Sequence, residues 1–227
     1  MPFELLRAGG TVAELHLGSA ALVGGPLPAG VARVHQPADR AVVLGSGQPE
    51  DCVDREACAA AGVQVVRRRS GGGAVLVEPG GLVWVDLAVP STDPRWCADV
   101  GQAAWWVGEA WATALRRSGA DALEVWKGPM LRREWSALVC FAGLAGGEVT
   151  GPGARKVVGI SQRRTRHGSL FQCACLLRWE PAALLGLLRL TPAERARAAA
   201  GLPGVAQGVG PGKEEEILAQ LVQALPQ

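Results

Sequence analysis

Short apolar runs separated by glycine, proline and polar residues recur along this chain and predict β-strands. The run 82–89 is apolar except for Asp86, which is typical of a strand covered on both faces. Two later runs flank the polar turn Thr165–Gly168 and predict a β-hairpin. The predicted strands are 32–35, 41–44, 63–66, 74–77, 82–89, 136–141, 156–162 and 169–177.

Apolar residues at helical spacing predict helices between several of these strands. Thr191 suits the N-cap of one helix and Pro192 its first helical position. The predicted helices are 11–22, 51–61, 99–117, 181–190, 192–200 and 213–225. Strands outnumber helices and do not alternate strictly with them, so the pattern favours a mixed-sheet α/β or α+β fold over a doubly wound parallel one.

A basic, glycine-rich loop joins two of the predicted strands. Its residues are Arg67-Arg68-Arg69-Ser70-Gly71-Gly72-Gly73. Glycines let a ligand approach the backbone closely, and arginines supply positive charge suited to a carboxylate, a phosphate or an acidic protein surface. The spacing fits neither a dinucleotide-binding fingerprint nor a Walker A loop. From these residues alone, a ligand-binding loop and a hairpin turn with solvated arginines remain equally good interpretations.

A second motif, Arg155-Lys156-Val157-Val158-Gly159-Ile160-Ser161-Gln162-Arg163-Arg164, follows later in the chain. Together with the glycine loop and the segment 42–48, it resembles the superfamily of lipoate-protein ligase A, octanoyltransferases and biotin ligases, over roughly residues 10–190. The resemblance implies an α+β fold with a mixed, largely antiparallel sheet flanked by helices. It also implies that Lys156 contacts an acyl carbonyl or acyl phosphate. The acyl-binding residues implied in the same way are Arg69, Ser70, Gly71, Gly72, Gly73, Ala74, Val77, Gly159, Ser161 and Gln162. Members of this superfamily commonly carry histidine where Val77 stands, so a more apolar pocket wall is expected here.

Cys140 decides between the mechanisms found in this superfamily. It lies in the region where the cysteine-dependent octanoyltransferases and amidotransferases carry an acyl-accepting cysteine, which makes that branch the nearest. A thiolate can take an acyl group from a thioester and pass it to a lysine amine, with Lys156 favouring the thiolate or polarising the carbonyl. An isolated apolar cysteine would instead be inert core. The flanking motifs favour the nucleophile, and such transfer of octanoate or lipoate needs no cofactor.

Two other functions stay open. An ATP-dependent lipoate ligase would form a lipoyl-adenylate with ATP and Mg²⁺ and would need no cysteine. However, the Asn-Asp segment of such ligases is replaced here by Gly143–Glu148. A non-catalytic acyl-binding or scaffold relative is the third possibility. The presence of the loop, Lys156 and Cys140 argues against it.

A basic turn suggests where a partner protein docks. Arg163, Arg164 and Arg166 suit an acidic partner, or are the solvated edge of a hairpin. The partners implied by the resemblance are acyl carrier protein and lipoyl domains, either the H protein of glycine cleavage or the acyltransferase subunit of 2-oxoacid dehydrogenases. His167 is expected to be a solvated turn residue.

Composition limits the remaining possibilities. The 227 residues are 48% hydrophobic and carry a net charge of +2, so bulk charge predicts no nucleic-acid partner. The absence of a long apolar run and of a basic, apolar leader predicts a soluble cytoplasmic protein without membrane contact. The six cysteines lack C-x-x-C spacing, so neither a disulfide framework nor a metal site is expected. We expect a catalytic domain over 1–200, with 201–227 as a linker and a C-terminal helix packed on it.

Overall fold

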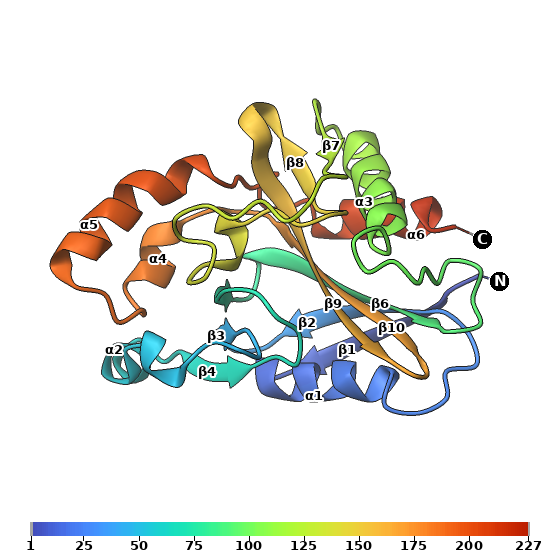
Figure 1. Cartoon of the computed structure of the whole chain (residues 1–227), viewed down its shortest axis with the longest axis horizontal. Helices are drawn as coiled ribbons and strands as arrows, with labels where there is room; N and C mark the ends of the chain where they lie inside the picture. The colour runs from blue at the N-terminus through green and yellow to red at the C-terminus, as the bar shows by residue number, and fades with distance from the viewer. Residues whose placement is uncertain (1, 227) are drawn as a thin grey trace.

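The computed structural model describes residues 2–226, and within them a seven-stranded sheet forms the centre of the molecule (Figure 1). All neighbouring strands are antiparallel except β1 and β2, which are parallel. The order across the sheet is β1 (Glu4–Gly10), β2 (Val31–Pro37), β6 (Leu82–Pro90), β10 (Gly168–Leu176), β9 (Arg155–Thr165), β8 (Val149–Gly151) and β7 (Glu124–Val125). The predicted mixed sheet is therefore confirmed.

A smaller sheet lies beside the large one and is enclosed by short helices. Its order is β4 (Gln64–Arg67), β3 (Ala41–Leu44) and β5 (Val75–Val77), with β3 parallel to β4 and antiparallel to β5. The helices beside it in Figure 1 are α2 (Arg55–Ala60), α4 (Pro181–Leu185) and α5 (Pro192–Gly201). Leu44, Leu188 and Leu202 are almost fully buried in the core that these elements share.

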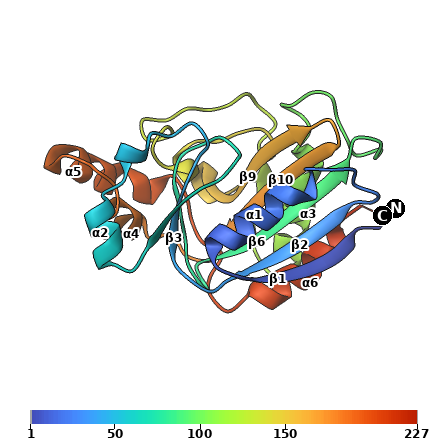
Figure 2. The same ribbon diagram turned by 90° about the horizontal axis from the view of Figure 1, so that it is seen from below.

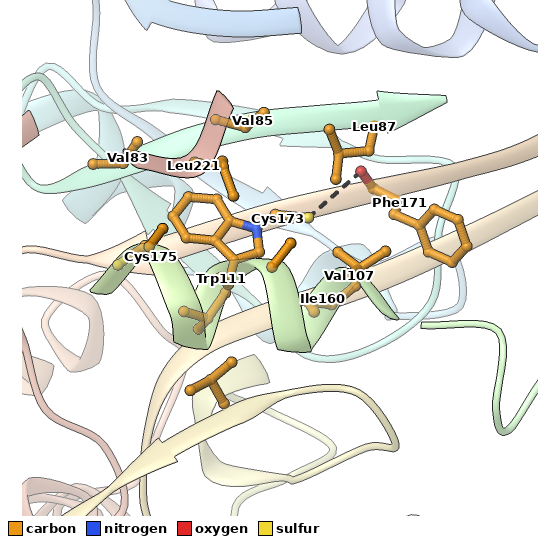
Figure 3. Packing of buried hydrophobic residues seen from close by; sticks show 14 of the residues in the cluster. Val83, Val85, Leu87, Val107, Trp111, Ile160, Phe171, Cys173, Cys175 and Leu221 are labelled. Carbon is orange, nitrogen blue, oxygen red and sulfur yellow. Dashed lines mark hydrogen bonds between the residues drawn. The ribbon is translucent and has the colours of Figure 1, made fainter. Parts of the chain in front are cut away.

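Helices cover both faces of the large sheet. Figure 2 shows α1 (Val12–Leu22) in front of the strands and α3 (Trp105–Arg117) with α6 (Glu214–Ala224) behind them. Trp111 of α3 is fully buried and packs among side chains from β6, β10 and α6 (Figure 3). Cys173 is drawn beside it, with its thiol directed at the Phe171 carbonyl oxygen 3.7 Å away. Burying such large aromatic area is a main source of the stability of this layer.

Local capping explains where two helices begin. The side chains of Thr11 at α1 and Thr191 at α5 each accept a hydrogen bond from the backbone N–H three residues on. The residue at that position is a glutamate, and its carboxylate accepts from the backbone N–H of the threonine. These are capping boxes, and the Thr191 N-cap was expected from the sequence. The hairpin around Thr165–Gly168 is also confirmed, with Thr165 paired to Gly168 between β9 and β10.

Several predicted boundaries were wrong. The helix expected over 51–61 begins at Arg55, because the Asp54 side chain caps the N–H of Ala57. The helix expected over 99–117 begins at Trp105, after a turn that Asp99 holds by accepting from Gly101 N–H at 2.7 Å. The helix expected over 181–190 ends at Leu185.

The largest error is the strand expected over 136–141. This run is turns followed by a short 3₁₀ helix, Cys140–Ala142; within it Val139 is buried in the core shared with α4 and α5, whereas Ala137 is exposed. Strands β1, β7 and β8 were missed, because β1 is an edge strand with many exposed side chains and the other two are very short. The segment 201–212 is more ordered than a linker, since the N–H of Gln207 donates to the Lys156 carbonyl at 2.9 Å. No helix within residues 2–226 is long and apolar enough to cross a membrane.

Candidate active site

A cavity lies where the large sheet, the small sheet, α1 and the Cys140–Ala142 helix meet. Its apolar wall comes mainly from β3, β5, β6, β9 and β10, and its few polar groups come from His16, Arg68, Ser161 and Gln172. The apolar lining residues are Val43, Val75, Val77, Leu82, Trp84, Phe141, Ile160, Cys173 and Ala174, with Gly159 and Cys140 completing the wall. Such a shape suits a hydrocarbon chain whose polar end meets a small group of polar side chains.

Cys140 stands at this wall on the first turn of the 3₁₀ helix. Its backbone N–H donates to the Ala74 carbonyl at 3.0 Å, which ties it to the glycine loop. The approach is close: a Cβ on Gly73 would lie 2.6 Å from the Val139 carbonyl carbon. A Cβ on Gly72 would lie 3.5 Å from the Cys140 Sγ atom. Glycine is therefore required for the loop to reach the thiol.

The guanidinium of Arg68 lies close to this thiol. Its side chain is buried, and its Nη2 atom lies 3.9 Å from the Cys140 Sγ atom. The same guanidinium donates to three backbone carbonyl oxygens: Val43 at 3.2 Å, Gly71 at 2.7 Å and Gly73 at 2.9 Å. Arg68 therefore both shapes the glycine loop and places positive charge beside Cys140.

Lys156 is buried behind the cavity and does not line it. Its Nζ atom donates to the carbonyl oxygens of Cys140 and Gly143, both at 3.1 Å, and lies 2.7 Å from Glu148 Oε1. An ammonium has three hydrogens, so these acceptors use all of them. The structure thus places Lys156 against the backbone of Cys140 and Gly143, outside the lining of the cavity.

A row of polar contacts crosses the cavity wall. The Ser70 hydroxyl lies 2.9 Å from the Ser161 hydroxyl and 3.0 Å from Gln172 Oε1, and Gln172 Nε2 lies 3.3 Å from His16 Nδ1. The His16 ring packs on Trp84, with 4.5 Å between the ring centroids. Burial, together with the positive charge of Arg68, lowers the pKa of His16 to about 4, so this imidazole is neutral at pH 7.

An ionisable pair lies directly beneath this wall. His35 Nε2 and Asp86 Oδ2 are 3.0 Å apart with both side chains fully buried, and Trp84 Nε1 donates to Asp86 Oδ1 at 2.8 Å. Asp86 is the residue that interrupts the apolar run of β6. Its carboxylate fixes the indole on which His16 stacks.

The structure sorts the residues implied by the motifs into three groups. Val77, Gly159 and Ser161 line the cavity together with Cys140, whereas Ser70 and Ala74 contact lining residues from behind. Gly71, Gly72 and Gly73 form the loop around Arg68. Arg69 is exposed, and Gln162 lies on β9 between two residues that face the other way; neither lines the cavity.

The basic residues of the hairpin do not share one surface. Arg163 joins Arg67, Arg68, Arg69 and Ser46 around an open concavity next to the cavity. Arg164 points to the opposite face of β9, donates to the carbonyls of Cys97 and Ala98, and lies 4.7 Å from the Trp96 ring centroid. Arg166 donates to His167 at 3.1 Å in the turn. Side-chain alternation along a strand explains the separation of Arg163 from Arg164.

Four of the five remaining thiols are poor candidates for chemistry. Burial raises the pKa of Cys173 and Cys175, which keeps both protonated, and it raises the pKa of Cys52 and Cys58 as well. Within residues 2–226, no group of three or more His, Cys, Asp or Glu side chains is placed to hold a metal ion.

Sequence reasoning missed four of the groups at this site: His16, Arg68, Glu148 and Gln172. A signal was present for Arg68, because side chains of consecutive residues in extended chain alternate in direction and all three arginines cannot face solvent. The other three are polar residues in elements with no motif, so only the fold brings them together.

Comparison with known proteins agrees with this architecture. Residues 29–211 match the family described as the lipoyl protein ligase A/B catalytic domain. A bipartite lipoate protein ligase from Thermoplasma acidophilum, analysed with its E2 lipoyl domain, has a TM-score of 0.75 at 20% identity, covering 99% of this chain and 82% of that one. A lipoate protein ligase from T. acidophilum with bound lipoic acid has a TM-score of 0.73 at 18% identity, with coverages of 99% and 84%.

A lipoate-protein ligase A bound with ATP has a TM-score of 0.71 at 20% identity, again covering 99% of this chain and 84% of that one. No curated protein sequence matches this chain. At such identities the likeness is one of fold, and it confirms the predicted α+β architecture with a largely antiparallel sheet.

The glycine loop offers a matched pair of substitutions. Gly72 has φ +101°, and a Cβ there would lie 2.8 Å from Arg68 Nη2, whereas a Cβ on Gly71 would meet no atom within 4 Å. We expect Gly72→Ala to lower the free energy of unfolding by roughly 1–3 kcal/mol through backbone strain. Gly71→Ala should change it by less than about 0.5 kcal/mol. Urea unfolding of the two variants measures both, and equal losses would contradict the strain assigned to Gly72.

His16 should make the protein sensitive to acid. Its pKa is lower in the folded state, about 4, than the ordinary value of 6.5, so the unfolded chain binds the proton more readily. Stability from this residue is therefore complete above pH 6.5 and lost as the pH falls towards 4. Between pH 7 and 4.5, the wild type should lose roughly 2–3 kcal/mol more than His16→Gln. Urea unfolding at both pH values tests this, and equal losses would show that His16 is not the titrating group.

Proposed function

Because this chain belongs to the lipoyl protein ligase A/B catalytic domain family, we propose that it is an acyltransferase of protein lipoylation that works through a thioester on Cys140. The acyl group is octanoyl or lipoyl, its donor is a carrier thioester, and its acceptor is a lysine of a lipoyl domain. One observation carries the proposal: the only described cysteine that combines partial exposure with a place on the wall of the apolar cavity is Cys140.

The transfer divides into two steps, a thioester exchange onto Cys140 and then formation of an amide with the acceptor lysine. In the first, the Cys140 thiol gives its proton to solvent and the sulfur bonds to the donor carbonyl carbon. The donor carbon–sulfur bond breaks, and the released thiolate takes up a proton. In the second, the neutral lysine amine of the acceptor attacks the same carbon, loses a proton and expels the Cys140 thiolate. All bonds and protons are accounted for in both steps without ATP or a metal ion.

In our proposal Lys156 positions Cys140 and does not contact the acyl group. Its contacts to the carbonyls of Cys140 and Gly143 hold the 3₁₀ turn that presents the thiol. Replacing Lys156 alone leaves Glu148 buried without its partner, a change that costs on the order of 3–5 kcal/mol. Loss of activity in Lys156→Ala would therefore reflect stability as much as catalysis.

An ATP-dependent lipoate ligase is the second candidate, and one observation favours it. The open concavity lined by Ser46, Arg67, Arg68, Arg69 and Arg163 adjoins the apolar cavity, and such a cluster suits the phosphate of an acyl-adenylate. Under this alternative Cys140 carries no acyl group and the reaction depends on ATP and Mg²⁺. A non-catalytic acyl-binding relative is the third candidate, and it would show neither activity.

Intact-protein mass spectrometry separates these candidates. Incubated with octanoyl-acyl carrier protein and no ATP, the wild type should gain one octanoyl group, and peptide mapping should place it on Cys140. Cys140→Ala should gain none. Cys140→Ser should lose nearly all transfer to a lipoyl domain, because a hydroxyl without a strong base is a much poorer nucleophile.

Cys52→Ser is the matched control, since that thiol is also partly exposed but lies outside the cavity lining. It should acquire the adduct as the wild type does. Normal lipoylation by Cys140→Ala that requires ATP would establish the ligase. Absence of both activities in the wild type would leave only the non-catalytic relative.

A partner surface follows from the position of Arg163. The T. acidophilum relative was analysed with an E2 lipoyl domain, which supports lipoyl domains, such as the glycine-cleavage H protein or a dehydrogenase acyltransferase subunit, as acceptors here. If the concavity steers an acidic carrier or acceptor, Arg163→Glu should lower kcat/KM with octanoyl-acyl carrier protein roughly tenfold at low salt. Acylation by a small octanoyl thioester should change little.

Arg117→Glu makes the same charge change at the end of α3, on the other side of the sheet, and should leave both rates intact. Arg164 is unsuitable for this test because it holds the 97–98 backbone. Equal loss with both donors in Arg163→Glu would mean that this residue shapes the cavity instead of steering a protein partner.

A further inference from the structure

We propose that Arg68, and not Lys156, is the cation that stabilises the Cys140 thiolate during acyl transfer. The inference rests on the proposed function, since it assigns a role in the acyl-cysteine steps. Its basis is an asymmetry between two buried cations on either side of Cys140, one neutralised by a carboxylate and the other not.

The positive charge of Arg68 is uncompensated. The side chain is 5% exposed, and its neighbours are the three carbonyl oxygens of Val43, Gly71 and Gly73 and the Cys140 sulfur. Within residues 2–226, no carboxylate forms an ion pair with it. Carbonyl dipoles orient the guanidinium without cancelling its charge. A thiolate 3.9 Å away would be the nearest anion.

Lys156 has the opposite electrostatic character. Its ammonium lies 2.7 Å from Glu148, and both side chains are almost fully buried. The pair is neutral overall, and the carboxylate also accepts from the N–H groups of Ala145 and Ile160 at 2.7 and 3.0 Å. This pair therefore contributes little field at the sulfur, and its hydrogen bonds are used to hold backbone.

Neither Arg67 nor Arg69, the neighbours of Arg68 in sequence, is placed to stabilise the thiolate. Arg67 donates to the carbonyls of Gly45 and Gln48 at 2.9 and 2.7 Å, and it lies 3.7 Å from Glu50. Arg69 is exposed. Of the three consecutive arginines, only the middle one reaches the cavity and the thiol.

Arg68 acts in both chemical steps. Before the first step it stabilises the thiolate that remains when the Cys140 proton passes to solvent. In the second step the acyl carbon–sulfur bond breaks as the lysine amine forms the amide, and the electron pair returns to the sulfur beside the same guanidinium. The residue is fixed before the charge appears, so little reorganisation is required.

Alkylation of Cys140 by iodoacetamide tests this role separately from acyl transfer. The rate at pH 7, followed at Cys140 by peptide mass spectrometry, should fall roughly tenfold or more in Arg68→Met. Arg68→Lys should recover much of the rate because it keeps the charge. Arg117→Met, the same change at an exposed arginine of α3 on the other side of the sheet, should react as the wild type does. Thermal unfolding of each variant identifies any loss of fold.

A measurement on the wild type alone also tests whether an uncompensated cation lies beside the Cys140 thiol. An uncompensated cation beside the thiol should favour an anionic reagent. The ratio of iodoacetate to iodoacetamide rates at Cys140 should therefore exceed the ratio for N-acetylcysteine amide, and the excess should shrink with added salt. A ratio equal to or below that of the small thiol would overturn the inference, even if the Arg68 variants fail to fold.

The outcomes also separate this inference from the proposed function. Octanoyl adduct formation together with wild-type alkylation of a folded Arg68→Met would overturn the role of Arg68 and leave the transferase intact. Reduced alkylation in that variant, with no adduct in the wild type, would support the cation beside the thiol and overturn the transferase.

Discussion

The ion pair between Lys156 and Glu148 organises the segment that carries the candidate nucleophile. Two charges removed from water are tolerated when they are paired and make further hydrogen bonds. Here Lys156 donates to the carbonyls of Cys140 and Gly143, while Glu148 accepts from Ala145 and Ile160. One end of the pair is thus tied to the 3₁₀ turn and the other to β9, so the position of the thiol relative to the large sheet is set by a neutral, hydrogen-bonded unit.

Close backbone contact then brings the glycine loop to this turn. A Cβ on Gly45 would overlap the carbonyl oxygen of Gly72, and one on Gly73 would lie 2.6 Å from the Val139 carbonyl carbon. The small sheet can approach the 3₁₀ turn only because these positions lack side chains. Arg68 fills the space beneath the loop and binds its carbonyls. The cavity is therefore a product of two constraints, the ion pair on one side and side-chain-free backbone on the other.

The polar groups inside the cavity divide into neutral and charged ones. Burial keeps His16 neutral at pH 7 because it lowers the pKa of the imidazole to about 4, and Trp84 holds the ring against Gln172. The guanidinium of Arg68 supplies positive charge next to the sulfur. Together with an apolar wall, this arrangement suits an acyl chain whose reactive carbonyl meets a thiolate, which is the basis of the proposed transfer.

Regular, locally encoded features were predictable from the sequence. Alternation and apolar runs identified β2–β6, β9 and β10, and Thr191 with Pro192 indicated the start of α5, because these signals depend on neighbours within a few residues. The glycine loop was recognisable as a motif for a related reason, since close backbone approach demands glycine, and the structure brings it to Cys140, the candidate nucleophile of the sequence analysis. The run 136–141 was misjudged because an apolar run does not by itself distinguish a strand from packed turns; here Val139 is buried beside α4 and α5, and Phe141 lines the cavity. Only the tertiary structure decided that Arg68, not Arg69, faces the sulfur, that Glu148 neutralises Lys156, and that His16 of α1 enters the cavity. These relations join residues distant in sequence, and their direction depends on how the two sheets and α1 pack, which no local pattern records.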